Sequence, residues 1–239
     1  VAGGRRLIEM GSRRAHESAA VSAARAAYIA GFDATSNLAA GDQYGIETAG
    51  TSAHAFTLLH DSEEQAFKAQ IETFGTGTTL LVDTYDTDAG VRKAIEVAGV
   101  ELGAVRIDSG DLPVEVARVR KLLDSLGATN TRITVTNDLD EHAIAALAAA
   151  PVDRYGVGTS VVTGSGVPTA GFVYKLVAHK NVGGDWVSVS KRSANKTNIG
   201  GRKQAIREIA GGLATKELLA AGHKVAVGSE DRELLVPLV

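Results

Sequence analysis

Cysteine is absent from the 239 residues, which excludes disulfides, thiolate catalysis and cysteine metal ligands and suits a reducing compartment such as the cytoplasm. No apolar run reaches transmembrane length and no signal-peptide pattern occurs. Aromatic residues make up only 5% of the chain, and none is interleaved with basic residues, so we expect no nucleic-acid surface. The net charge of -3 gives no overall attraction to nucleic acid or membrane, so any anion site must be local.

Signature motifs of several enzyme classes are also missing. The sequence has no HExxH metal-ligand spacing, no GxSxG nucleophile elbow and no GxxxxGK[ST] phosphate loop. The DDxxxTG run of type I phosphoribosyltransferases does not occur either. We therefore assign no metal ligand from the sequence.

What remains is a balanced composition with 44% hydrophobic residues, enough for one large domain or two small ones. The chain begins with Val1 rather than methionine and closes on an apolar run at 234–239. From these ends we expect a piece of a longer chain, truncated on both sides.

A strand–helix alternation starts near residue 80. Short β-branched runs at 79–87, 104–111, 132–140 and 154–162 alternate with helical spacing of apolar residues, which predicts parallel strands joined by right-handed crossovers. Residues 13–30 and 61–74 read as further helices, whereas 171–179 and 185–193 read as an antiparallel pair around the NVGGD turn. Because a full eight-unit barrel needs about 250 residues or more, we predict an irregular (β/α) barrel as one domain over 1–239, with a doubly wound open sheet as the alternative.

More than one acid or hydroxyl residue follows each predicted strand. Helix capping explains part of this excess, since Asp88 (or Thr87), Asp111 and Asp140 each precede a predicted helix. Capping leaves three carboxylates directly after apolar strands, at Asp83, Asp108 and Asp138.

In a parallel barrel these three positions converge on the carboxyl-end face, where active sites form. Carboxylates gathered there could bind a cation or ribose hydroxyls, or stabilise developing positive charge. Alternation puts Arg106 on the same side of its strand as Asp108, so it could form an ion pair or bind a carboxylate or phosphate ligand.

Two segments have features of phosphate binding. The YGVGTS run places Gly158 and Thr159 directly after a strand, where backbone N–H groups can approach an anion. The segment from Ser190 to Lys203 has five basic residues, no acid and a Gly-Gly pair, and can be either a phosphate loop or a solvated basic loop.

Of six histidines, His54 stands apart because Gly50, Thr51 and Ser52 precede it and an apolar helix follows. The others suit ordinary surface or core positions.

Taken in order, the runs MGSRR, GFDATSN, GTSAH, DTYDT, VRIDSGD, NDLDE and YGVGTS resemble the nicotinate phosphoribosyltransferase family over nearly the whole chain. The resemblance implies an irregular α/β barrel of the type II phosphoribosyltransferases. It also implies condensation of nicotinate with phosphoribosyl pyrophosphate to give nicotinate mononucleotide and pyrophosphate, coupled to ATP hydrolysis in NAD salvage.

Site residues follow from the same motifs. His54 of GTSAH corresponds to the histidine that ATP phosphorylates in the family, and so is the expected phosphohistidine nucleophile. The nicotinate pocket falls on Thr51 and Arg106, and the ribose phosphate on Gly158 and Thr159. The resemblance and the strand positions together predict that four acids and one further arginine lie near the base, the ribose and the pyrophosphate. These residues are Arg13, Asp33, Asp83, Asp108 and Asp138.

The resemblance further implies Mg²⁺ with ATP, a homodimer, and a region before Val1 with a β-rich domain and an aromatic residue that closes over the nicotinate. One departure is the basic loop, which has Ile199 where the family usually has proline before the glycine, so roles for Lys191 and Lys196 stay open. Two alternatives remain: a nicotinamide phosphoribosyltransferase, which the intact GTSAH motif disfavours, and a non-catalytic fragment of the enzyme.

Overall fold

The computed structural model describes residues 1–164, 169, 171–193 and 196–235. The chain divides into two compact units, Val1–Pro168 and Thr169–Val239. Among the described residues, parallel strand pairing is confined to the first unit and the second pairs its strands antiparallel. A single barrel domain over 1–239 stays a prediction.

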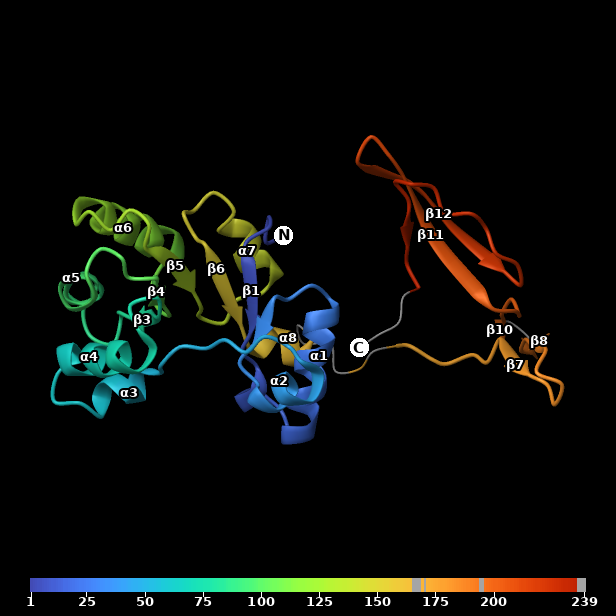
Figure 1. Ribbon diagram of the computed structural model, residues 1–239, viewed down its shortest axis with the longest axis horizontal. Coiled ribbons are helices and arrows are strands. Elements are labelled where there is room, and N and C mark those ends of the chain that lie inside the picture. Colours follow the sequence, from blue (N-terminus) through green and yellow to red (C-terminus); the bar gives the residue numbers. More distant parts are fainter. Residues whose placement is uncertain (165–168, 170, 194–195, 236–239) are drawn as a thin grey trace. The chain divides into compact units, whose positions relative to one another are not determined.

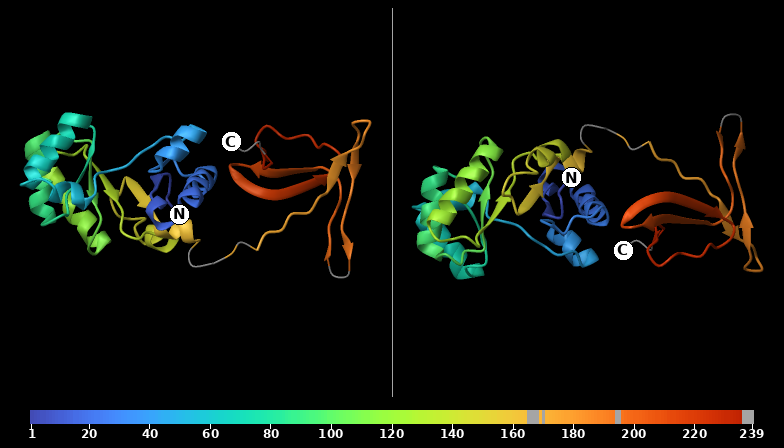
Figure 2. Two further views of the ribbon diagram at one scale, coloured as in Figure 1. Left: turned by 90° about the horizontal axis from the view of Figure 1, so that it is seen from below. Right: turned by 90° about the horizontal axis from the view of Figure 1, so that it is seen from above.

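The first unit is built on one six-stranded parallel sheet with the order β2-β1-β6-β5-β4-β3. The sheet curls into an open half-barrel (Figures 1 and 2), which confirms the predicted fold class of an irregular barrel of parallel strands. Its strands are β1 (Arg6–Glu9), β2 (Ala34–Thr35), β3 (Thr79–Leu81), β4 (Ala104–Ile107), β5 (Arg132–Val135) and β6 (Arg154–Val157).

Helices connect successive strands, as the alternation predicts. They are η1 (Ser12–Arg14), α1 (Glu17–Ile29), α2 (Leu38–Tyr44), α3 (His54–Leu58), α4 (Glu63–Phe74), α5 (Thr87–Ala98), α6 (Leu112–Ser125), α7 (Glu141–Ala146) and α8 (Thr159–Thr163). The helix expected over 13–30 is interrupted, because Ala15 is extended and His16 caps α1 by accepting from Ser18 N. None of the described helices combines the length and the apolar character needed to cross a bilayer.

Strands β1 and β2 were not predicted. β2 has only 2 residues, too few for apolar alternation to stand out from the flanking loops, whereas β1 has 4 residues, as many as the predicted β4, and its pattern was overlooked. Beyond β2, Thr48 forms a parallel bridge with Thr35, so the segment between α2 and α3 extends this edge of the sheet. The same segment crosses from the β2 side of the unit to the β3 side (Figure 2).

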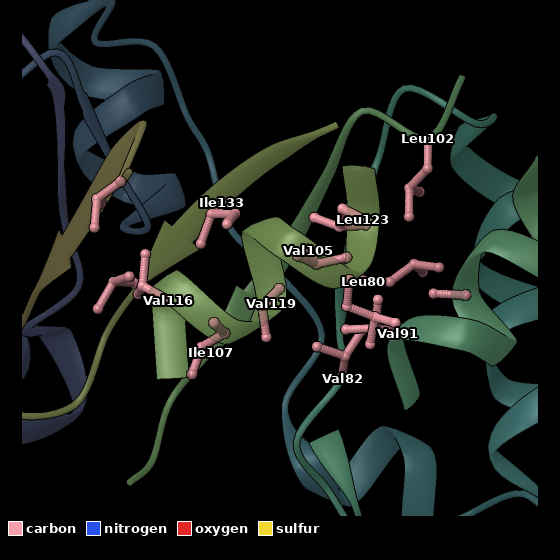
Figure 3. Close-up of a cluster of buried hydrophobic side chains, with 14 of the residues drawn as sticks. Leu80, Val82, Val91, Leu102, Val105, Ile107, Val116, Val119, Leu123 and Ile133 are labelled. Carbon is pink, nitrogen blue, oxygen red and sulfur yellow. The ribbon is translucent and has the colours of Figure 1, made fainter. Parts of the chain in front are cut away.

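One face of the sheet packs under α5, α6 and α7 and forms the main hydrophobic core. Figure 3 shows Val116 and Val119 of α6 among side chains from β4 and β5, including Ile107 and Ile133. We call this the outer face. Because side chains alternate along a strand, the neighbours of these core residues, such as Arg106 between Val105 and Ile107, lie on the opposite, inner face.

The helix caps divide the acids as expected, with one correction. Asp140 caps α7 by accepting from the backbone N–H groups of His142 and Ala143, as predicted. Asp111 occupies the N-cap position of α6 without a side-chain bond. For α5 the prediction of Asp88 or Thr87 is wrong.

Asp86 caps α5 instead, accepting from Ala89 N at 2.8 Å. Because the helix begins at Thr87, Asp88 falls inside its first turn and pairs with Arg118 of α6. The three remaining acids, Asp83, Asp108 and Asp138, cap none of the described helices.

The second unit consists of antiparallel strand pairs. The predicted hairpin around NVGGD is present but shorter than expected, because only β7 (Ala178–Lys180) and β8 (Trp186–Ser188) pair. The remaining strands are β9 (Arg192–Ser193), β10 (Lys196–Thr197), β11 (Lys203–Ala210), β12 (Leu213–Ala221) and β13 (Arg232–Glu233).

Candidate active site

Polar side chains gather at the carboxyl ends of the parallel strands. They come from the residues that directly follow β1, β4, β5 and β6, joined by Thr51 and His54 from the segment that crosses the sheet edge. Because all six strands run parallel, loops far apart in the sequence meet at this one edge. Two cavities are lined by these groups, and they share four residues: Met10, Arg13, Arg106 and Asp108.

The Asp138 cavity measures about 150 Å³ and is mostly polar. Its lining adds Arg14, Asp138, Gly158 and Thr159 to the shared residues. The His54 cavity measures about 250 Å³ and adds Thr51, His54 and two serines, Ser12 and Ser36. A third, largely apolar cavity of about 590 Å³ lies beside Thr51 and is lined by Leu38, Phe56 and Phe74.

Arg106 is the most heavily bonded group between the two site cavities. Its Nε donates to Thr136 Oγ1 at 2.9 Å and its Nη2 to Asp108 Oδ1 at 2.8 Å. Its Nη1 donates to Thr51 Oγ1 at 2.6 Å and to the Ser52 carbonyl at 3.5 Å. Since a guanidinium has five N–H groups, these four bonds leave one N–H on Nη2 for a ligand.

Asp108 links this arginine to the histidine. Besides Arg106, its Oδ1 accepts from Thr136 Oγ1, and its Oδ2 lies 3.5 Å from His54 Nε2. Burial acts to raise the pKa of Asp108, but the hydrogen bond from Thr136 and the charge of Arg106 outweigh it and hold that pKa below its usual value. Asp108 is therefore a carboxylate at neutral pH and can stabilise positive charge on a nearby imidazole or ligand.

His54 is the first residue of α3 and is partly exposed at the cavity wall, with 38% of its side chain accessible. Its Nδ1 lies 3.1 Å from Thr84 Oγ1, and this hydroxyl follows β3. Thr84 and Asp108, which follow two neighbouring strands, thus lie beside the two ring nitrogens. Sequence reasoning missed Thr84, although it lies in the DTYDT run.

Asp138 sits in a strained loop. It has φ 46° and the preceding Asn137 has φ 95°, a region that side chains other than glycine rarely adopt. Such backbone strain clusters at functional sites because the surrounding structure has to hold it. Its Oδ1 accepts from Thr159 Oγ1 at 3.4 Å, and both residues line the Asp138 cavity.

Two sequence-predicted site residues are placed elsewhere. Asp83 is buried, and its Oδ2 accepts from Asp108 N at 2.8 Å and Ser109 Oγ at 2.6 Å, so it ties the end of β3 to the end of β4. Asp33 accepts from Leu7 N at 2.8 Å at the start of β2. Neither lines the two site cavities, so their contacts with a substrate stay predictions.

A fully buried glutamate positions the loop after β1. Glu9, only 1% exposed, accepts from Gly11 N and from Thr35 Oγ1, and the latter bond measures 2.6 Å. Thr35 Oγ1 in turn accepts from Asn37 N at 3.0 Å, and Asn37 Nδ2 donates to Ser12 Oγ at 2.9 Å. This network joins the loops after β1 and β2, which contribute Arg13 and Ser36 to the site. Because β1 was not recognised in the sequence, this network was not predicted.

The basic segment Ser190–Lys203 belongs to the second unit, and residues 194 and 195 lie outside the described part of the chain. Lys203 Nζ donates to the carbonyls of Ile199, Gly200 and Gly201, so this ammonium holds the Gly-Gly turn. A phosphate-binding role for the segment stays a prediction. Among the described residues, no group of three or more His, Asp or Glu side chains is arranged to hold a metal ion.

Comparisons with known proteins identify the family of this chain. The model of the nicotinate phosphoribosyltransferase (NAPRTase) family matches residues 5–223. Nicotinate phosphoribosyltransferase pncB1 of Mycobacterium tuberculosis is 58% identical over 100% of this chain and 54% of its own length. The nicotinate phosphoribosyltransferase of Bacillus subtilis is 43% identical over 84% of this chain and 43% of its own length.

Two solved structures show the same fold. A crystal structure described as nicotinate-nucleotide pyrophosphorylase from Pyrococcus furiosus superimposes with a TM-score of 0.73 at 25% identity, covering 100% of this chain and 60% of that one. Human nicotinic acid phosphoribosyltransferase superimposes with a TM-score of 0.64 at 28% identity, covering 91% and 52%. The chain thus spans about half the length of the curated relatives it matches.

Proposed function

The chain belongs to the nicotinate phosphoribosyltransferase family, and we propose that its two site cavities bind nicotinate and phosphoribosyl pyrophosphate and join them into nicotinate mononucleotide and pyrophosphate. The observation that carries the proposal is Arg106, which lies between the cavities with one uncommitted N–H. A cation fixed in this way suits a flat ring that bears a carboxylate.

Nicotinate is proposed to lie in the His54 cavity with its carboxylate on Arg106 and Thr51. One N–H of Nη2 is uncommitted, so a single strong hydrogen bond is supported by the geometry as it stands. The bidentate contact expected from the residue type requires the ligand to displace Thr51 Oγ1 or the long bond to the Ser52 carbonyl. Nicotinamide lacks the negative charge and would leave the positive charge of Arg106 less compensated, which favours the acid over the amide.

Phosphoribosyl pyrophosphate is proposed to occupy the Asp138 cavity. Gly158 and Thr159, at the start of α8, supply backbone and hydroxyl donors for the ribose phosphate, and Arg13 supplies charge. In the transfer, the ring nitrogen of nicotinate forms a bond to C1 of the ribose while the bond from C1 to the pyrophosphate oxygen breaks. Positive charge develops on the ribose, and the carboxylates of Asp108 and Asp138 stabilise it.

His54 is proposed to take the γ-phosphate of ATP. A ring nitrogen forms the bond to phosphorus as the bond to the ADP oxygen breaks, and Asp108 stabilises the positive imidazole. Mg²⁺ would neutralise the phosphate oxygens of ATP or pyrophosphate. Since Mg²⁺ commonly uses only one or two protein carboxylates together with substrate phosphates, Asp138 in its mainly polar cavity fits this role.

We propose the metabolic role and the oligomeric state from the family alone. We expect the reaction to serve NAD salvage in the cytoplasm and the protein to act as a homodimer, as the resemblance implies.

The test measures binding and turnover of the chain side by side. Radiolabelled nicotinate and nicotinamide are each equilibrated with the protein, and product formation is followed with phosphoribosyl pyrophosphate, Mg²⁺ and ATP. We expect nicotinate to bind at least tenfold more tightly and to be the substrate that is converted. A preference for nicotinamide would contradict the assignment, and binding of both substrates without conversion would identify a chain that keeps the binding groups but lacks the activity.

Phosphorylation is tested separately with ATP labelled at the γ-phosphate. We expect an acid-labile, alkali-stable phosphate on the wild type and none on His54→Ala. An acid-stable phosphate, or label that persists in His54→Ala, would show that His54 is not the acceptor.

A further inference from the structure

Three arginines lie together at the amino ends of the strands, at the edge of the sheet opposite the candidate active site. They are the first residues of β1, β5 and β6: Arg6, Arg132 and Arg154. The residues that follow them, Leu7, Ile133 and Tyr155, pack in or against the outer core. Because side chains alternate along a strand, all three arginines lie on the inner face.

The strand register makes them neighbours. Arg6 pairs directly with Arg154 between β1 and β6. Thr134 pairs with Arg154 between β5 and β6, and Arg132 is two residues before Thr134 on the same face. Like charges side by side on a sheet destabilise it, so this cluster acts against folding unless something compensates for its charge.

Acidic residues compensate for only part of the cluster. Arg6 forms an ion pair with Glu47. Within the described ranges, Arg132 and Arg154 take part in no ion pair and donate no side-chain hydrogen bond, although the charges of Asp153 and Glu47 reach Arg154. Asp153 itself is engaged, since its Oδ2 accepts from Ile133 N at 2.7 Å.

The surroundings of Arg154 disfavour the charged form of its side chain. Burial, followed by the charges of Arg132 and Arg6, lowers the pKa of its guanidinium. Arg132 is exposed, so the cluster can be reached from solvent.

Two buried polar atoms beside the cluster also lack partners. Thr134 is only 1% exposed, and its Oγ1 makes no hydrogen bond among the described residues. The Nε of Arg6 is likewise buried and unpaired there. Buried polar groups in folded proteins are nearly always bonded, so donors left unpaired next to surplus positive charge suit a ligand that accepts hydrogen bonds.

We propose that Arg6, Arg132, Arg154 and Thr134 form an anion site for a phosphate-sized dianion at the amino end of the half-barrel. Two guanidinium groups without ion-pair partners match two negative charges, and their planar N–H arrays match phosphate oxygens. Free phosphate and the phosphate of a nucleotide share this chemistry. The site uses none of the groups that the proposed reaction uses.

The experiment titrates the chain with inorganic phosphate at constant ionic strength, using calorimetry. An Arg13→Gln background weakens binding at the active-site edge. We expect Arg154→Gln and Arg132→Gln to lower phosphate affinity at least tenfold. Arg92→Gln is the matched control, because it removes an exposed arginine of α5 and should leave affinity unchanged. Phosphate affinity within twofold of the parent in Arg154→Gln would overturn the proposal.

Stability gives a second, independent readout. In phosphate-free buffer Arg154→Gln should unfold at a higher temperature than the parent, because it relieves repulsion that the nearby acids compensate only in part. Saturating phosphate should remove or reverse that advantage. A lower unfolding temperature without phosphate would mean that Arg154 serves a partner within the protein and would overturn the proposal.

Repeating the titration with adenosine monophosphate distinguishes a site for nucleotide phosphates from a site for free phosphate. Binding that is lost in Arg154→Gln assigns the site to nucleotide phosphates. Binding of inorganic phosphate alone assigns it to the free ion.

Discussion

Replacing Arg106 by lysine tests the central contact of the proposed nicotinate site. Lysine keeps the positive charge but offers three donors on one nitrogen instead of five on a planar group. It cannot reach Thr136, Thr51 and Asp108 with the geometry that the guanidinium uses. The change therefore removes the fixed orientation of the cation while leaving its charge in place.

The expected size of the effect follows from the bonds that are lost. A hydrogen bond to a charged group contributes about 1.5–3 kcal/mol. Loss of the contact with the nicotinate carboxylate should therefore weaken nicotinate binding by about 10- to 150-fold. Loss of the Nε bond to the buried Thr136 should lower the free energy of unfolding by about 1.5–3 kcal/mol as well.

The assay compares nicotinate and phosphoribosyl pyrophosphate affinities by calorimetry, alongside urea unfolding. Arg120→Lys is the matched control, because Arg120 also makes several bonds, to Asp124 and to the carbonyls of Ala128 and Thr131, away from the site. We expect Arg120→Lys to lose stability without losing nicotinate affinity. If Arg106→Lys weakens both ligands equally, or neither, Arg106 holds the scaffold rather than the substrate and the reasoning fails.

Two further predictions concern the same edge of the sheet. Gly11→Ala would place a Cβ 2.3 Å from Val162 Cγ1 and 2.9 Å from the Gly158 carbonyl, so we expect a loss of about 1–3 kcal/mol in urea unfolding, against almost none for Gly77→Ala, whose Cβ meets nothing within 4 Å. Similar curves for the two variants would contradict this. The lowered pKa of Asp108 contributes stability that is present above its unfolded pKa of about 3.9 and is lost as the pH falls through the folded value. Asp108→Asn should therefore be less stable than the wild type at pH 7, and the difference should shrink below about pH 4; a difference that does not change with pH would show that the carboxylate's charge plays no part.

The sequence by itself determined the strand–helix order from β3 to β6 and the three acids that cap none of the described helices. Apolar alternation marked β4 and β5, and the positions just after them put Asp108 and Asp138 at the carboxyl edge. These are local features, because side-chain period and helix capping depend on residues only a few positions apart. The same local logic placed Arg106 on the side of Asp108, and the structure shows the two bonded at 2.8 Å.

Only the tertiary structure decided how those groups are used. Asp83 and Asp108 follow equivalent strands, yet one ties two strand ends together and the other opens on the cavities. Glu9 and Thr84, which the sequence did not single out, fix the loop after β1 and the ring of His54. Each of these roles depends on a neighbour that the curl of the sheet brings within hydrogen-bond distance. The spacing of residues along the sequence does not reveal how the sheet curls, so these contacts could not be predicted from it.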